Sequence, residues 1–290
     1  MNRRYMQLDV FAGHPGDGNP LAVVLDGDGL DDATMQAIAR WTRLPETTFV
    51  VAATSPEASY GLRIFSPRRE VPFAGHPSVG TAHAVLDAGI ARPRNGLLVQ
   101  QGIAGLLPLR VDGDGATRTI AVRTPTARVM EVATRDDPRL ADALRGLPLG
   151  TLPPALMDGG RRWWLVELAD EASLRAATPD WNAISRLAHD TESMGICVFA
   201  RSDDPVYYLA VRAWVGAPAH FEDAASGAAN ATLAAWLASR DALPGDTGFY
   251  RVSQGREVGH DAIIELNVDA SGEVWSGGRA CIIVNGHIDW

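Results

Sequence analysis

Two segments of this chain begin helices with side chains that could hold an anion or move a proton. In FAGHPSVGTAHAVL, residues 73–86, a histidine lies between a glycine and a proline at the start of a predicted helix. Backbone N–H groups at a helix N-terminus lack partners and carry a partial positive charge, so a carboxylate or phosphate binds there readily. The segment therefore predicts an anion site formed by Gly75, His76 and Ser78.

The second segment, EDAASGAANATLAAWL, starts another helix of small residues. Asp223, Ser226, Gly227 and Ala228 lie at its predicted N-terminus, where Asp223 would also suit the role of helix cap. Two such termini facing each other across a cleft would clamp a small anionic metabolite. In a third segment, LPETTFVV, Glu46 directly precedes a predicted strand, and its carboxylate is expected to point into a cleft.

The composition excludes several classes of function. All 26 basic residues are arginines, and a guanidinium cannot form a Schiff base, so enzymes that need a catalytic lysine are excluded. A net charge of −9 argues against nucleic-acid binding. Two cysteines suggest no disulfide framework, and no apolar run approaches the roughly 20 residues that span a bilayer. With no signal-peptide core at the N-terminus, a cytoplasmic protein without membrane contact is expected.

The residue pattern predicts two α+β halves joined around residues 120–128. Strands are expected near residues 5–12, 19–27, 47–53, 60–66, 162–168, 195–200, 206–214, 262–268 and 280–286, with a hairpin series over residues 96–124. Helices are expected over residues 31–42, with Asp31 or Asp32 as N-cap, and over residues 180–188.

The two halves are similar to each other. The segment LRIFSP precedes the first small-residue helix, and the segment VRAWV precedes the second in the same way. This similarity aligns Arg63 with Arg212, at an offset of about half the chain. Residues 79–87 and 228–238 are apolar on almost every side. A helix that is apolar all round must be buried all round, which strands wrapping around it would accomplish.

The chain resembles the PhzF-like family of phenazine-biosynthesis isomerases over nearly its whole length. The resemblance is carried by DVFAGHPGDGNPLAVVLDGDGL, RIFSPRREVPFAGHPSVGTAHAV, EDAASGAANATLAAWL, QGREVG and GGRACIIVNG. It implies an α+β fold like that of diaminopimelate epimerase, with a curved sheet around a central helix in each of two domains. The domains are expected at residues 1–122 and 123–290. This division allows the last strand of the sequence to join the first domain.

The resemblance also implies a mechanism without a cofactor or a metal. The family's glutamate, which moves a proton between carbons of the substrate, falls on Glu46, and its assisting histidine and aspartate fall on His76 and Asp223. The active site is expected in the cleft between the domains, and the resemblance allows a homodimer without specifying the oligomeric state. Substrate-binding positions are expected at Asn19, Gly75, Ser78, Ser226, Gly227 and Ala228.

Other interpretations stay open at this point. Most glutamates are solvated surface charges, a histidine in a turn is often structural, and Asn19 follows a glycine and suits a simple turn. The sequence has Ala224 and Ala228 where the family usually has proline and serine, which leaves the substrate unassigned. A non-catalytic small-anion binder or regulatory protein, and an epimerase or lyase using the same residues, are the alternative functions.

Overall fold

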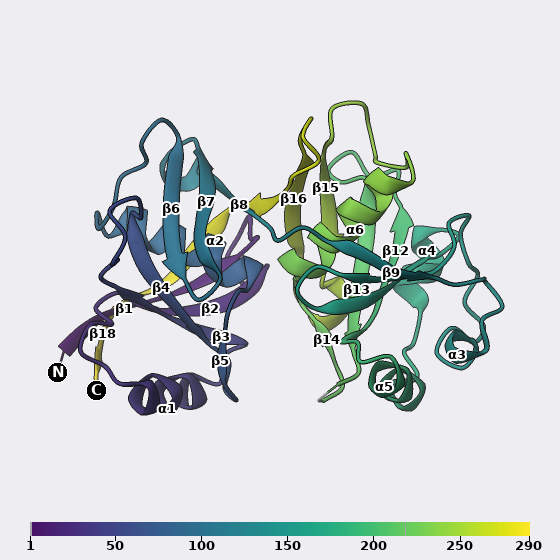
Figure 1. The fold of residues 1–290 in the computed structure, drawn as a ribbon, viewed down its shortest axis with the longest axis horizontal. Helices are drawn as coiled ribbons and strands as arrows, with labels where there is room; N and C mark the ends of the chain where they lie inside the picture. The colour runs from purple at the N-terminus through teal and green to yellow at the C-terminus, as the bar shows by residue number, and fades with distance from the viewer. Residues whose placement is uncertain (1, 218) are drawn as a thin grey trace. The chain divides into compact units, whose positions relative to one another are not determined.

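The computed structural model describes residues 2–217 and 219–290, and the chain divides into two compact units. Unit 1 consists of Met1–Arg123 together with Gly277–Trp290, and unit 2 of Thr124–Ser276. Each unit has its own mixed sheet and its own buried helix (Figure 1). Among the described residues, no helix is both long and apolar enough to cross a membrane.

The sheet of unit 1 has the strand order β18–β1–β2–β3–β4–β6–β7–β8. The pairs β2–β3 and β4–β6 are parallel, and the other neighbours are antiparallel. A short strand, β5, pairs with the end of β4. The strands are β1 (Asn2–Val10), β2 (Asn19–Val24), β3 (Glu46–Val51), β4 (Tyr60–Phe65), β5 (Glu70–Val71), β6 (Leu97–Gly102), β7 (Gly105–Asp112), β8 (Thr119–Arg123) and β18 (Ala280–Asp289).

Helix α2 (Gly75–Asp87) lies inside this sheet and packs against β1, β2, β3 and β8 (Figure 1). Every residue from Gly75 to Val85 is buried, as expected for a helix without a charged face. The contact is close at Gly80, where an added Cβ would lie 2.5 Å from a Val10 methyl group and 2.6 Å from a Leu21 methyl group. The small residues of the sequence therefore let the sheet close around the helix.

Helix α1 (Asp32–Thr42) lies outside the sheet, against β3 and β4. Its N-cap is Asp31, whose carboxylate accepts a hydrogen bond from the Thr34 N–H at 2.8 Å. Its apolar face packs on Phe49 and Phe65. This face of β3 is therefore covered by α1, while the opposite face of the strand lines the interior around α2. A 3-10 turn, η1 (Gly115–Thr117), links β7 to β8.

Unit 2 repeats the same plan with the order β9–β10–β11–β12–β13–β15–β16. Again two pairs are parallel, β11–β12 and β13–β15, and a short strand, β14, pairs with the end of β13. The strands are β9 (Arg128–Val132), β10 (Ala155–Asp158), β11 (Arg162–Glu167), β12 (Gly195–Arg201), β13 (Leu209–Val215), β14 (Phe221–Asp223), β15 (Phe249–Gln254) and β16 (Ala262–Val268), followed by β17 (Val274–Gly278).

Helix α6 (Gly227–Ser239) is the buried helix of unit 2 and packs against β10, β11 and β16. The outer helices α4 (Glu171–Ala176) and α5 (Trp181–Asp190) pack on β12 and β13, and short α3 (Pro138–Ala141) follows β9. A 3-10 turn, η2 (Arg256–Val258), separates β15 from β16.

The order of strands and helices confirms the predicted α+β fold, in which one pattern occurs twice. In each unit a parallel pair of strands (β2–β3 or β11–β12) and then a short strand (β5 or β14) precede the central helix. The short strand pairs with a longer strand, β4 or β13. The first strand after the central helix, β6 or β15, is parallel to that longer strand. Both central helices begin within a few residues of their expected starts. Helix α4 was not expected, because six residues are too few for a clear helical period.

Candidate active site

Strand β3 directs Glu46 toward the central helix of unit 1. Successive side chains of a strand point to opposite faces, so Glu46 and Thr48 share one face of β3. The Thr48 hydroxyl lies 2.8 Å from the hydroxyl of Thr81 on α2, which identifies this face as the inner one. Phe49, on the opposite face, packs in the α1 cluster. Glu46 is the first residue of the strand, and its side chain is only 14% exposed.

His76 meets Glu46 from the first turn of α2. Its Nε2 atom lies 3.5 Å from the Glu46 Oε2 atom, and its side chain is 8% exposed. The helix begins after Ala74, whose backbone is extended and which has no side chain able to cap the turn. Two of the three residues that the resemblance marked as catalytic are therefore brought together beside an uncapped helix N-terminus.

The His76 imidazole is neutral at physiological pH. Burial lowers its pKa to about 3, although the Pro20 backbone carbonyl accepts a hydrogen bond from the ring and opposes the shift. Within the described part of the chain Nε2 makes no hydrogen bond, and its contact with the Glu46 carboxyl group is the 3.5 Å approach. A neutral imidazole has one donor and one acceptor nitrogen, so Nε2 can accept a hydrogen bond from a protonated carboxyl group or donate one to a carboxylate, according to the tautomer.

The other expected ligand positions of unit 1 lie close to this pair in the fold. Asn19 is the buried first residue of β2, the strand that pairs with β3 beside Glu46, and Gly75 is the first residue of α2. Ser78 is buried as well, but its hydroxyl donates to the Ala74 carbonyl at 2.9 Å and accepts from Gln100 Nε2 at 3.0 Å. The Ser78 side chain is therefore part of the helix start itself.

The expected residues of unit 2 lie where β14 leads into α6. Asp223 is the last residue of β14 and pairs with Ala213 of β13. The interpretation of Asp223 as the helix cap is wrong: the N-cap is Ser226, whose hydroxyl accepts from the Ala229 N–H at 3.3 Å. Strand pairing holds Asp223 in the sheet, three residues before the cap. Gly227 and Ala228 form the first turn of α6.

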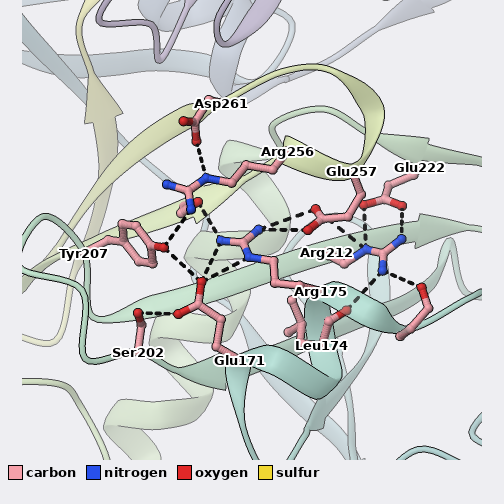
Figure 2. A network of polar contacts seen from close by, with 12 residues as sticks. Glu171, Leu174, Arg175, Ser202, Tyr207, Arg212, Glu222, Arg256, Glu257 and Asp261 are labelled. Atoms are coloured by element: carbon pink, nitrogen blue, oxygen red, sulfur yellow. Dashed lines mark hydrogen bonds and ion pairs between the residues drawn. The ribbon is translucent and has the colours of Figure 1, made fainter.

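The residue before Asp223, Glu222, belongs to a network of ion pairs that no sequence pattern predicted (Figure 2). Arg212 of β13 forms a bidentate pair with Glu222, at 2.9 and 2.7 Å, and both side chains are about 5% exposed or less. The Arg212 guanidinium also donates to two backbone carbonyls, and Glu257 of η2 lies between Arg212 and Arg175. Because Glu222 directly precedes Asp223, this network fixes the end of β14.

Unit 1 has a corresponding bidentate ion pair between its short strand and the longer neighbouring strand. Arg63 of β4 forms a bidentate pair with Glu70 of β5, with both hydrogen bonds at 2.7 Å. Arg63 and Arg212 were the residues that aligned the two halves in the sequence. Their shared role explains that alignment, since each arginine ties the short strand before the central helix to its longer neighbour.

A cavity of about 330 Å³ in unit 1 lies elsewhere in the fold. It is lined by the first residues of β1, the ends of β2 and β3, Tyr60 and Ile90, and none of the expected site residues contributes to it. Among the described residues, no three or more His, Cys, Asp or Glu side chains are grouped so that they could hold a metal ion. The candidate site is therefore defined by side-chain contacts rather than by this cavity.

Comparison with known proteins identifies the family of the chain. The model of the family described as phenazine biosynthesis-like protein, PhzC-PhzF, matches residues 8–286. A trans-2,3-dihydro-3-hydroxyanthranilate isomerase of Pseudomonas aeruginosa is 34% identical, over 93% of this chain and 92% of the relative. Antisense-enhancing sequence 1 of Schizosaccharomyces pombe is 32% identical, over 97% of both chains.

Solved structures support the same fold. A phenazine biosynthesis protein of the PhzF family from Bacillus anthracis superimposes with a TM-score of 0.83 over 100% of both chains, at 22% identity. A structure described as a probable proline racemase from Agrobacterium radiobacter superimposes with a TM-score of 0.64 over 99% of this chain and 92% of that chain, at 15% identity. The matched family model and the isomerase relatives show that this chain belongs to the PhzC/PhzF phenazine biosynthesis-like family and is one of its isomerases.

Proposed function

We propose that this isomerase moves a proton between two carbon atoms of a small carboxylate-bearing metabolite, with Glu46 as base and then acid. The observation that carries the proposal is the contact of the Glu46 carboxyl group with the neutral His76 ring at 3.5 Å, in largely buried surroundings. A carboxylate must be able both to take and to return a proton in such a reaction, and a sheltered position favours this double role.

The proton balance of the step needs no further reactant. Glu46 removes a proton from one carbon, and the C–H bonding electrons move into the neighbouring double bonds of the substrate. The protonated Glu46, whose O–H proton exchanges with solvent while the substrate is bound, then delivers one proton to a second carbon, so one C–H bond is broken, one is formed and the composition of the substrate is unchanged. While Glu46 holds the proton, its O–H can donate to the lone pair of His76 Nε2, which stabilises the intermediate acid.

Negative charge that develops on the substrate needs a donor, and we assign this role to the start of α2. The first turn carries the positive end of the helix dipole, and Ala74 leaves it without a side-chain cap. Asp223 is assigned the orientation of polar substrate groups, with Asn19, Gly75, Ser226, Gly227 and Ala228 as further binding positions.

The relatives narrow the class of substrate to be tried first. Trans-2,3-dihydro-3-hydroxyanthranilate, on which the Pseudomonas relative acts by its name, is a ring that carries a carboxylate, an amino group and a hydroxyl group. We propose a small ring or enamine carboxylate of this chemistry for the present protein. An anion of this kind suits a helix N-terminus.

The test is incorporation of deuterium from D2O into carbon positions of trans-2,3-dihydro-3-hydroxyanthranilate, followed by mass spectrometry and NMR. The wild-type protein is expected to exchange a carbon-bound hydrogen and to form the isomer. Glu46→Gln should lower the rate at least 100-fold, since general acid–base catalysis contributes about 10² to 10⁴. Glu57→Gln, which changes an exposed glutamate of the same unit, is the matched control and should retain full activity.

Three outcomes would point elsewhere. Full activity of Glu46→Gln would remove the proton shuttle. Exchange at one carbon without a shift of the double bonds would indicate an epimerase. Binding of ring carboxylates, seen as a raised unfolding temperature but with no exchange into any of them, would indicate the non-catalytic binder.

A further inference from the structure

One buried glutamine contacts the first turn of each central helix. Gln100 is 2% exposed and Gln254 is fully buried. They lie on β6 and β15, which occupy the same place in the two units: β6 is parallel to β4 and β15 to β13, the longer partners of the short strands before the central helices. Glutamine is mostly found at protein surfaces, so two deeply buried glutamines on equivalent strands require an explanation.

Gln254 uses both ends of its amide to join three parts of unit 2. Its Oε1 atom accepts hydrogen bonds from the Ser226 backbone N–H at 3.2 Å and from Asn230 Nδ2 at 2.7 Å. Its Nε2 atom donates to the Asp223 backbone carbonyl at 2.7 Å. The end of β14, the N-cap of α6 and the first turn of α6 are therefore tied to one side chain.

Gln100 makes the corresponding contact in unit 1. Its Nε2 atom donates to the Ser78 hydroxyl at 3.0 Å, and that hydroxyl donates to the Ala74 carbonyl at 2.9 Å. Ser78 is the fourth residue of α2, as Asn230 is of α6, and Asn230 Nδ2 likewise donates to the carbonyl of its N-cap, Ser226, at 2.9 Å. Each glutamine thus fixes a polar residue that closes the helix start.

We propose that Gln100 and Gln254 are positioning residues of this isomerase. Gln100 holds the turn that carries His76, and Gln254 holds Asp223 together with the turn that follows it. Neither amide is assigned a contact with substrate. The inference rests on the proposed function for the roles of His76 and Asp223. A catalytic group displaced by about 1 Å can lower the rate about 100-fold, so rigid supports of this kind have a direct kinetic effect.

The first test measures local rigidity in the intact protein. Gln254→Met and Gln100→Met keep nearly the same shape and remove the hydrogen bonds. Amide hydrogen exchange in Gln254→Met should become at least tenfold faster over residues 223–230, including the Ser226 N–H, and remain unchanged over residues 75–81. Gln100→Met should show the reverse pattern, so each variant is the control for the other. Unchanged exchange in both segments, or equal acceleration in both, overturns the proposal that each glutamine holds its own helix start in place.

The second test separates positioning from general stability. Both methionine variants should lower kcat about 10- to 100-fold in the deuterium assay while changing KM less than threefold. The control is Thr191→Val, which removes the hydroxyl that accepts from Trp164 Nε1 in unit 2 and should lower the unfolding temperature without lowering kcat. Faster local exchange with an unchanged kcat overturns the positioning role.

The two proposals fail in different ways. Retained activity in Glu46→Gln contradicts the proton shuttle and leaves the amide-exchange pattern unaffected. If the methionine variants lack the segment-specific acceleration of amide exchange, the positioning role of the glutamines is contradicted. The requirement for Glu46 is then unaffected.

Discussion

Two buried histidines make unit 1 sensitive to acid. Burial lowers the pKa of His76 to about 3 and that of His83 to about 4, and nearby Arg118 contributes to the shift of His83. The backbone carbonyls of Pro20 and Gly278 oppose these shifts without cancelling them. In the unfolded chain both rings would titrate near the ordinary value of about 6.5. Lowering the pH below 6.5 therefore protonates the unfolded chain first.

The sign and the size of the effect follow from proton linkage. Above pH 6.5 both rings are neutral in both states and contribute no pH dependence. Below it, the unfolded chain binds up to two more protons than the folded one, so the free energy of unfolding falls by about 1.4 kcal/mol per pH unit for each ring. At pH 5 the loss is about 2 kcal/mol for each histidine and about 4 kcal/mol together, a large part of a typical domain's stability.

The assay is urea denaturation followed by circular dichroism at several values between pH 8 and pH 5. His83→Leu is expected to halve the dependence, from about 2.7 to about 1.4 kcal/mol per pH unit below pH 6, whatever it does to the stability at pH 8. His14→Gln is the control, because this side chain is 88% exposed and its 3.5 Å contact with Asp17 is of the exposed kind that contributes little; its effect on the dependence should be much smaller than that of His83→Leu. A free energy of unfolding that stays constant down to pH 5, or an equal dependence in His83→Leu, would refute the reasoning.

Two further substitutions test the support of Asp223. Arg212→Met leaves the Glu222 carboxylate buried without its bidentate partner. The free energy of unfolding of unit 2, measured by urea denaturation, should therefore fall by about 3–5 kcal/mol. A loss below about 1 kcal/mol would contradict this reasoning. Gly255 has a φ of +96°, and an added Cβ would lie 2.3 Å from the Ala224 carbonyl oxygen. Gly255→Ala should therefore cost more than about 1 kcal/mol and lower kcat, and an unchanged unfolding temperature would show that the loop adapts freely.

Much of the fold could be predicted because its strongest signal is local. The two central helices have small apolar residues on all sides, and only burial on every side explains that pattern. Strands such as β1 and β2 show the expected run of apolar residues bounded by a turn of glycine, proline and aspartate. The short strands β5 and β14 were missed, since two or three residues carry no period and are held by the pairs Arg63–Glu70 and Arg212–Glu222.

Site residues could be predicted where they belong to a recognisable sequence motif. They could not be predicted where only contacts in the folded protein identify them. The resemblance singled out Glu46 and His76, and the strand alternation brings them into contact. EDAASG offers two side chains suited to capping, and sequence alone could not tell that β14 would take Asp223 and leave Ser226 as the cap. Gln254 stands in the quoted QGREVG, but nothing local shows that its amide is buried against a helix start.

Strand β18 has a consequence for how this polypeptide is made. It pairs with β1 along residues 2–10, yet it comes from residues 280–289, whereas unit 2 is one continuous stretch. During synthesis the middle of the chain can therefore finish folding before the beginning does. Until residues 280–289 leave the ribosome, β1 has a bare edge with unmet hydrogen-bonding groups, which invites pairing with other nascent chains. Loss of only these few residues would thus damage unit 1, most of which is translated before unit 2.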